Sequence, residues 1–406
     1  MLRRCSAGNF AERHFWETVD PIELIPLADY VSPAMPTEHA FRSLLKRVQR
    51  RFGAKSDEDK PMLPSGALIR TPPPGDDIAG PLDCGPIVQT LHAHLDDWAA
   101  GAVASPRMKL IVVPACDNTG SIESWARSQN HVLLAPPDRD ELTRTDGLAA
   151  TESVDSIGEG LLVIPQLERW FLRQRNGLKP LRTLLTRLAA SQRRCLIGCD
   201  AWAWAYLAKA ADADLMLPRP LTFMPFDAAR LRRWFVDFAV DDGQVATFRL
   251  ARNGEDVLAC DDKGEPCSTW LRLLAARSGG IPWVAWHLWR ASLQVRNDDA
   301  ALSDQAASTV SDDQRTVWVV DIDHCPLPQG HEERALLTLH ALLIHGGLSA
   351  AELEEVLPAT GEASVVQALV DSRHLRCERG NFSVRPIAYP GIRRALEAAG
   401  FPMRAS

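Results

Sequence analysis

The sequence lacks three features that would assign it to common specialised classes of protein. It has no apolar run that approaches the roughly 20 residues needed to cross a bilayer, and its basic start is not followed by an apolar signal segment. It also lacks a large excess of either charge, with 45 Lys and Arg against 52 Asp and Glu and a net charge of −7. Nothing therefore draws the whole chain to nucleic acid or anionic lipid. We expect a cytoplasmic protein, in which any such binding would use a local patch.

The cysteines also do not form a regular pattern of pairs. The nine cysteines are scattered and odd in number, and the one close pair, Cys195 and Cys199, has no second pair to complete a tetrahedral metal site. The sequence thus predicts neither a disulfide framework nor a bound metal. What it has is 406 residues, 46% of them hydrophobic, which is enough for two or three domains with a buried core.

Short apolar runs alternate with helical patterns in the first half of the chain. The runs are typical of parallel strands that are buried on both faces, as in the stretch from Lys109 to Pro114. Strands that alternate with helices in this way form an α/β domain. The predicted strands are 110–113, 132–135, 161–164, 195–198 and, more weakly, 221–224, and the predicted helices are 121–129, 178–191 and 200–211. The sequence therefore predicts an α/β core with a doubly wound parallel sheet over residues 67–226.

The rest of the chain divides by composition. Residues 1–66 are predicted to be an N-terminal extension that carries an amphipathic helix over 37–51. Residues 227–297 are predicted to be mainly helical, and the Asp, Ser and Ala run within 298–330 indicates a linker. Residues 331–406 contain the pattern of three helices followed by a β-hairpin, which is the element order of a winged helix.

The loop after the first strand of the predicted sheet is the most informative segment. It reads Pro114-Ala-Cys-Asp-Asn-Thr-Gly-Ser121 and precedes a helix, so that backbone N–H groups and the positive end of a helix dipole can face an anion. A phosphate-binding P-loop, G-x-x-x-x-G-K-[ST], places Lys directly after its second Gly. Aligned on Gly120, this chain has Ala115, Ser121 and Ile122 at the positions of the first Gly, the Lys and the Ser or Thr. The alternative is an ordinary α/β loop in which Ser121 caps the helix.

Two acidic residues follow later strands of the sheet. Glu168 comes after strand 161–164, where an acidic pair would hold Mg²⁺ and activate water, but Pro165 and Gln166 occupy those positions. Glu168 is thus either a candidate general base or a partner of a helix dipole. Asp200 ends the next strand, at the edge of the sheet where sites of α/β proteins form. It is either a site residue or a helix cap.

These elements, in this order, resemble the AAA+/STAND group of P-loop ATPases, which includes origin-recognition-type ATPases, over about residues 67–390. The matches are 113–121 at the Walker A place, 161–168 at the Walker B place and 195–200 at the sensor 1 place. A fourth match is Ser278-Gly-Gly-Ile-Pro282 before a helix, which looks like the Gly-x-Pro motif that faces nucleotide in STAND proteins. The resemblance implies ATP or ADP as the ligand, with contacts from Asn118, Thr119, Gly120, Ser121, Asp200, Gly280 and Pro282. It also implies that the helical segment is a lid and that the winged helix packs on the core or binds protein partners.

The chain departs from that pattern in the groups that carry out chemistry. The Walker A Lys and the Walker B acidic pair are both missing, which removes most of the electrostatic stabilisation of phosphoryl transfer and makes Mg²⁺ binding unexpected. The sequence therefore predicts a degenerate ATPase-like protein that acts as a regulatory or interaction module with an unidentified protein partner. Two alternatives stay open: an active ATPase that uses Asn118, Ser121 and Glu168, and a DNA-binding regulator.

Contact with nucleic acid would fall to the hairpin of the predicted winged helix. The candidate recognition helix, 362–372, has no Lys or Arg, which argues against reading of the major groove. Arg376 and Arg379 lie on or near the hairpin and are candidates for contacts with a phosphate backbone. A solvated surface is the alternative reading of these two arginines.

Overall fold

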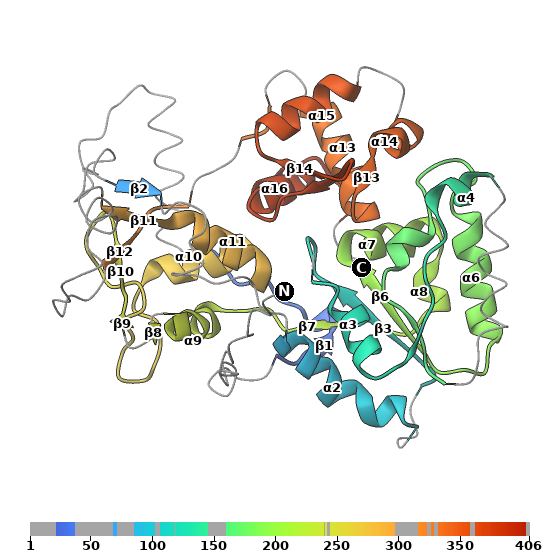
Figure 1. Ribbon diagram of the computed structural model, residues 1–406, viewed down its shortest axis with the longest axis horizontal. Helices are drawn as coiled ribbons and strands as arrows, with labels where there is room; N and C mark the ends of the chain where they lie inside the picture. The colour runs from blue at the N-terminus through green and yellow to red at the C-terminus, as the bar shows by residue number, and fades with distance from the viewer. Residues whose placement is uncertain are drawn as a thin grey trace, which may run out of the picture.

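Figure 1 shows the computed structural model of the chain, in which an α/β core, a central unit and a C-terminal unit follow one another along the sequence. The structure describes residues 22–36, 68–70, 85–101, 106–117, 119–144, 160–238, 240–241, 244–296, 316–322, 326–328, 332–357 and 362–402. The helix predicted over 37–51 and the candidate site residue Asn118 lie outside these residues. None of the described helices has both the length and the apolar character needed to span a membrane.

The core contains a six-stranded sheet in the order β1-β7-β3-β6-β5-β4. Its strands are β1 (Leu24–Pro26), β3 (Met108–Val113), β4 (Val132–Leu133), β5 (Leu162–Ile164), β6 (Cys195–Asp200) and β7 (Leu221–Phe223). Every pair is parallel except β1 with β7. The predicted parallel α/β sheet is therefore confirmed. Leu110, Ile111 and Val112 of β3 are fully buried, as expected for strands that are covered on both faces.

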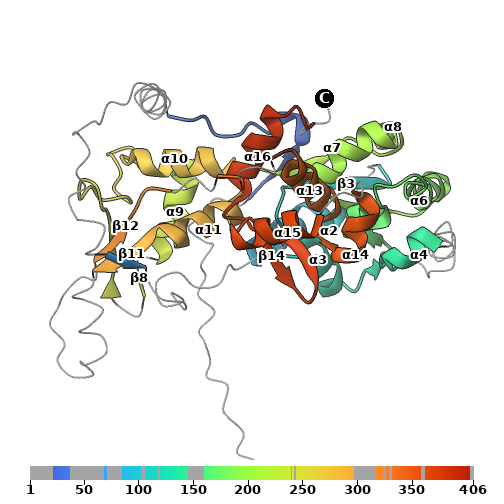
Figure 2. The same cartoon turned by 90° about the horizontal axis from the view of Figure 1, so that it is seen from above.

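Helices cover this sheet on its two sides, with α2 and α3 on one side and α7 and α8 on the other (Figure 2). The helices are α2 (Gly85–Ala99), α3 (Ser121–Ser128), α4 (Arg139–Arg144), α6 (Lys179–Ala190), α7 (Ala201–Ala210) and α8 (Ala213–Met216), with a 3₁₀ turn at Leu167–Trp170. Because β6 lies between β3 and β5, the carboxyl ends of these three strands are neighbours. The segments that follow them therefore meet at one edge of the sheet.

The central unit combines helices with a four-stranded sheet. Its elements are α9 (Ala228–Phe238), β8 (Val240–Asp241), β9 (Gln244–Val245), β10 (Thr247–Leu250), α10 (Thr269–Ser278), α11 (Pro282–Ser292), β11 (Leu293–Arg296) and β12 (Thr316–Val319). The sheet has the order β10-β12-β11-β2, in which β2 is Leu68–Arg70. The three helices lie where the sequence predicts a mainly helical segment. The sheet was not predicted, because its strands have at most four residues and pair with strands far away in the chain.

A cluster of aromatic rings lies in the core of the central unit. Trp289 lies 4.5 Å from Phe235, 5.0 Å from Phe248 and 5.5 Å from Trp270, measured between ring centroids. All four side chains are buried. Rings at these separations contribute about 0.5–1.5 kcal/mol per pair beyond the burial of their area, so the tryptophans serve packing.

The C-terminal unit, residues 332–402, contains the predicted helices and hairpin together with two further elements. It consists of α13 (Glu332–His345), β13 (Leu348–Ser349), α14 (Ala350–Val356), α15 (Glu362–Asp371), β14 (Leu375–Glu378), β15 (Asn381–Val384) and α16 (Tyr389–Ala398). Its strands form a sheet in the order β13-β15-β14. Ser349 and Glu352 make a reciprocal capping box at the start of α14, which satisfies two backbone donors of that helix.

Gly198 in β6 allows three core segments to approach closely. A Cβ atom at this position would collide with the Pro165 carbonyl oxygen and lie 2.6 Å from Ile122 Cδ1. We expect Gly198→Ala to lower the free energy of unfolding by about 1–3 kcal/mol because overpacking displaces the end of β5. Urea unfolding of the variant tests this expectation. Leu215→Ala, at a side chain that is 82% exposed, is the control and should change little.

Candidate functional site

In the loop between β3 and α3, a backbone N–H that could face a bound anion is instead hydrogen-bonded within the loop. The Thr119 N–H donates to Asp117 Oδ1 at 2.7 Å, so a carboxylate of the chain takes up a backbone donor of the loop. Gly120 adopts a left-handed conformation with φ of +59° and is the N-cap of α3 without a side-chain bond. Ser121 is buried as the first residue of α3 and is not the cap.

Three carboxyl groups converge beside this loop. Asp117, Glu168 and Asp200 follow β3, β5 and β6 in the chain, and all three line one cavity. The Asp200 N–H donates to Glu168 Oε2 at 3.1 Å. Asp200 Oδ1 in turn accepts a bond of 2.7 Å from the Trp202 N–H and caps α7. The structure thus shows the helix cap that the sequence left as one of two options for Asp200, and it places the same residue in the cavity wall.

Burial raises the pKa of each of these carboxyl groups. The pKa of Glu168 rises from 4.5 to about 7, mainly because burial disfavours the ionised form. The pKa of Asp200 lies well above its usual value because of burial and the neighbouring Glu168, and burial also raises the pKa of Asp117. Carboxyl groups that resist ionisation carry no positive charge. None of the three therefore offers a phosphate chain the cation that the Lys of a P-loop supplies.

The cavity is also small, and the C-terminal unit forms one of its walls. Its volume is about 90 Å³, whereas pockets for small-molecule ligands usually measure about 300–1,000 Å³. Leu342, Leu343 and Gly346 from the end of α13, with Ser383 and Val384 from β15, form the wall opposite the core. The residues present therefore do not fit a nucleotide while this unit is docked. Within the described ranges, no group of three or more His, Cys, Asp or Glu residues is arranged to hold a metal ion.

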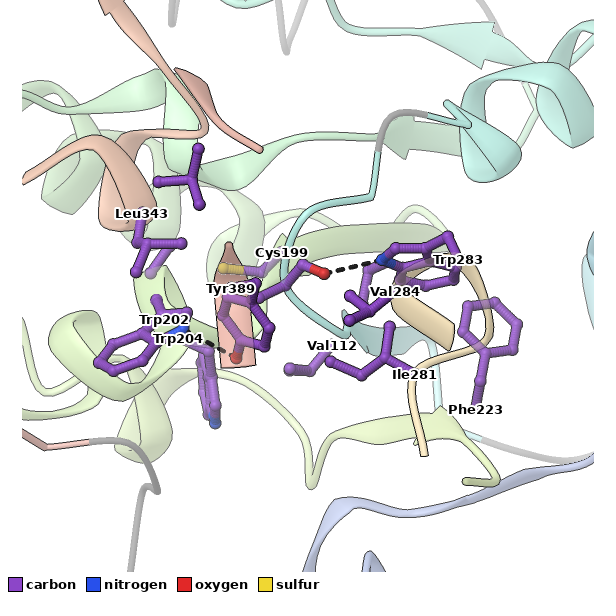
Figure 3. Packing of buried hydrophobic residues seen from close by; sticks show 14 of the residues in the cluster. Val112, Cys199, Trp202, Trp204, Phe223, Ile281, Trp283, Val284, Leu343 and Tyr389 are labelled. Atoms are coloured by element: carbon purple, nitrogen blue, oxygen red, sulfur yellow. Dashed lines mark hydrogen bonds between the residues drawn. The ribbon is translucent and has the colours of Figure 1, made fainter. Parts of the chain in front are cut away.

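The other predicted nucleotide contacts lie outside the wall of this cavity. Gly280 accepts a hydrogen bond from the Phe226 N–H at 2.9 Å, and Pro33 from the N-terminal segment lies beside it. Pro282 begins α11 and is buried. The helix still reaches the loop after β3, because Trp283 Nε1 donates to the Ala115 carbonyl at 2.8 Å (Figure 3).

Two arginines that the sequence analysis did not single out bind the C-terminal unit to the core. Arg139, which is 7% exposed, donates from its two Nη atoms to the carbonyls of His345 and Gly347, each at 2.6 Å. Its Nη1 atom also lies 3.6 Å from Glu352 Oε2. The Arg173 N–H donates to His345 Nε2 at 3.3 Å. No motif surrounds either residue, so only the tertiary structure reveals their role.

A third polar contact joins the two parts through aromatic side chains. Trp202 Nε1 donates to the Tyr389 hydroxyl at 3.2 Å, and both side chains are buried (Figure 3). Trp202 belongs to α7 of the core and Tyr389 to α16. The docked surface therefore extends from the end of α13 to the start of α16.

The two candidate contacts with nucleic acid lie on the β14–β15 hairpin. Arg376 Nε donates to Ser383 Oγ at 2.8 Å, and its Nη1 atom pairs with Glu378 Oε1 at 3.1 Å. Arg379 is exposed in the turn with φ of +52°. Partners from the same hairpin thus already neutralise one of the two cations, and contact with nucleic acid stays a prediction.

Comparisons with known proteins give fold-level likenesses only. No protein-family model matches the chain, and no curated protein matches it. Among solved structures it is similar to the ORC2 protein of Aeropyrum pernix in ADPNP and ADP complexes, with 13% identity, coverage of 91% of this chain and 96% of that chain, and a TM-score of 0.34. It is also similar to Cdc6p of Pyrobaculum aerophilum, with 13% identity, coverage of 82% and 99%, and a TM-score of 0.26.

A further likeness is to the Aeropyrum pernix ORC1 protein in complex with DNA, with 13% identity, coverage of 94% of this chain and 98% of that chain, and a TM-score of 0.28. Scores at this level carry no argument about the site or its ligands. The fold class rests on the parallel pairing of the core sheet itself.

The raised pKa of Glu168 predicts a pH-dependent contribution to stability. An acid whose pKa rises from 4.5 to about 7 on folding stabilises the fold fully below pH 4.5 and loses that contribution as the pH rises through 7. Relative to Glu168→Gln, which keeps an acceptor for the Asp200 N–H, the wild type should lose up to about 3 kcal/mol over this window. Urea unfolding at several pH values measures the difference. Parallel pH profiles of the two proteins would contradict the prediction.

Proposed function

We propose that the chain is a degenerate ATPase-like protein of the AAA+/STAND type that works as a regulatory or protein-interaction module and does not hydrolyse ATP efficiently. The observation that carries this proposal is the small cavity at the loop after β3, where the C-terminal unit forms the wall opposite the buried Glu168 and the half-buried Asp117 and Asp200. An active ATPase must admit ATP and release its products at each turnover, and a cavity of this size does not allow that while the C-terminal unit is docked.

The chemistry of the loop supports the same conclusion. Phosphoryl transfer depends on positive charge that is fixed around the transferred group, which P-loop enzymes supply with a Lys and a Mg²⁺ ion. At the corresponding edge of this sheet the chain presents Asp117, Glu168 and Asp200 without a Lys among the residues that line the cavity. Glu168 Oε2 also accepts a hydrogen bond from the Asp200 N–H, which restrains this side chain as a base.

The domain organisation belongs to the same proposal. We assign an ATPase-like core to residues 67–226, a lid to 227–297, a linker to 298–330 and a winged-helix domain to 331–406, after an N-terminal extension over 1–66. The linker range needs one correction, because Thr316–Val319 within it is β12, a buried strand that pairs with β10 and β11 of the lid. The order α13, β13, α14, α15, β14, β15 in the C-terminal unit supports the winged helix. The pairing of β2 with β11 joins a short part of the core range to the lid.

In this proposal ATP or ADP binding and docking of the C-terminal unit exclude each other. The cavity of about 90 Å³ gains room for a nucleotide only when the α13 end and β15 move away. The covered faces of the core and of the C-terminal unit would then be exposed together. A protein partner that binds either face would favour the open form, because it adds binding free energy to that form alone.

The first test is the release of phosphate. We expect the wild type with Mg²⁺ and ATP to release phosphate no faster than Glu168→Ala, because the groups that stabilise the transition state are missing. Steady-state phosphate release measures this. Release clearly above that of the variant would instead support an active ATPase. A rise in the thermal unfolding midpoint with ATP or ADP that is lost in Gly120→Glu would place a nucleotide at the loop.

The second test addresses docking. Arg139→Ala leaves the carbonyls of His345 and Gly347 without their donor, so we expect a loss of about 2–4 kcal/mol in the free energy of unfolding. Hydrogen exchange at the end of α13 should rise at the same time. Arg175→Ala removes an exposed arginine two residues from Arg173 and is the matched control. Unchanged exchange in α13 of the Arg139 variant would show that this residue does not hold the unit.

A further inference from the structure

The N-terminal segment 22–36 is fixed to the edge of the core sheet at its first end. Its strand β1 pairs antiparallel with β7, with Leu24 opposite Phe223. Backbone bonds of 2.9 Å continue the pairing on both sides, from the Leu27 N–H to the Pro220 carbonyl and from the Met224 N–H to the Glu23 carbonyl. The segment therefore starts as a full member of the core.

The middle of the same segment contacts the turn between α10 and α11. The Tyr30 hydroxyl donates to the Gly279 carbonyl at 2.6 Å. Pro33 lies so close to Gly280 that a Cβ atom on that glycine would be 3.1 Å from Pro33 Cδ. Gly279 and Gly280 both have positive φ, +67° and +78°, so the backbone of this turn can be exposed to the segment as only glycine allows.

The same part of the segment also reaches the C-terminal unit. Arg393 of α16 lies over Gly279, where a Cβ atom would collide with its Nη1 atom, and its Nη2 atom is 3.5 Å from Ser32 Oγ. Figure 2 shows the segment in blue, running along the molecule beside the ends of α10 and α16. One short stretch of chain thus touches the core, the central unit and the C-terminal unit within about 15 residues.

We propose that residues 22–36 form an intramolecular strap that holds the core, the α10–α11 turn and α16 in one arrangement, and thereby keeps the C-terminal unit docked. The inference rests on the proposed function, because it concerns the regulation of the same closed cavity. Tyr30 is a positioning residue in this device. It acts on the docked unit through Gly279, over which Arg393 of α16 lies.

The strap has the properties of a release point. It has no core of its own, and the side chains of Val31 and Met35 are 73% and 43% exposed. Its contacts beyond β1 include the Tyr30 hydrogen bond, the Arg393 contact with Ser32 and the packing of Pro33 on Gly280. Segments with few buried contacts open at lower free energy than the elements they connect. Loss of this hold should therefore free α16 before it unfolds the core.

Hydrogen exchange of the full-length chain tests the strap. We expect Tyr30→Phe, which removes only the hydroxyl, and Tyr30→Ala to raise exchange of the α16 amides about 5–30-fold, the change that one or two kcal/mol produces. Exchange in β3 and β6 should stay unchanged. Val31→Ala alters the same segment at an exposed side chain and is the matched control. It should leave α16 as it is in the wild type.

Two results would overturn the proposal. One is unchanged exchange in α16 of the Tyr30→Ala protein while the strap itself exchanges faster, which would show a segment that binds without holding anything. The other is an equal rise in β3 and β6, which would show general destabilisation. Neither result bears on phosphate release. Failure of the strap is thus separate from failure of the proposed function, which the ATP assay decides.

Discussion

The crowding of Asp117, Glu168 and Asp200 at the carboxyl ends of neighbouring parallel strands is the constraint on which the rest of this molecule depends. Ionised carboxylates are costly to bury unless hydrogen bonds or cations compensate them. The chain meets this cost with backbone donors at Thr119, Asp200 and Trp202, with raised pKa values, and with the nearby charge of Arg139. The backbone donors that bind these carboxyl groups are then not free to bind a ligand.

Closure by the C-terminal unit follows from the same balance. Arg139 binds the carbonyls at the end of α13, where the helix dipole carries partial negative charge and favours a cation. One buried guanidinium thus serves the acidic cavity on one side and the helix terminus on the other. The docked arrangement is directional, because its polar contacts fix carbonyl groups at given positions. Apolar packing alone would tolerate sliding.

The sequence predicted the parts of this fold that depend on local pattern. Continuous apolar runs indicate strands such as β3 and β6. Asp200 was singled out because it lies at the end of such a run. The sheet of the central unit was not predicted. Its strand β2 has only three residues and is recognisable as a strand only through its pairing with β11. Arg139 was not singled out for a related reason. Its role depends on a tertiary contact with the end of α13, which lies about 200 positions away in the chain.

The candidate site shows the same division. Position along the chain pointed to Glu168 and Asp200, which line one cavity, but Asp117 beside them was not singled out. Position could not show that another unit would close that edge, because the contact joins residues more than 150 positions apart. Nor could it separate Gly280 from the cavity, since the glycine spacing is the same whether the turn faces a ligand or a proline.

The pairing of the first strands with late ones sets an order on folding. β1 completes its hydrogen bonds only with β7 near residue 221, and β2 only with β11 near residue 293. Contacts of such long sequence separation form slowly, because closing the loop costs entropy before the pairing returns any free energy. During synthesis the amino-terminal strands must therefore wait, unpaired, until most of the chain has emerged. β1 and β2 are thus among the last strands to pair, although both precede their partners in the chain.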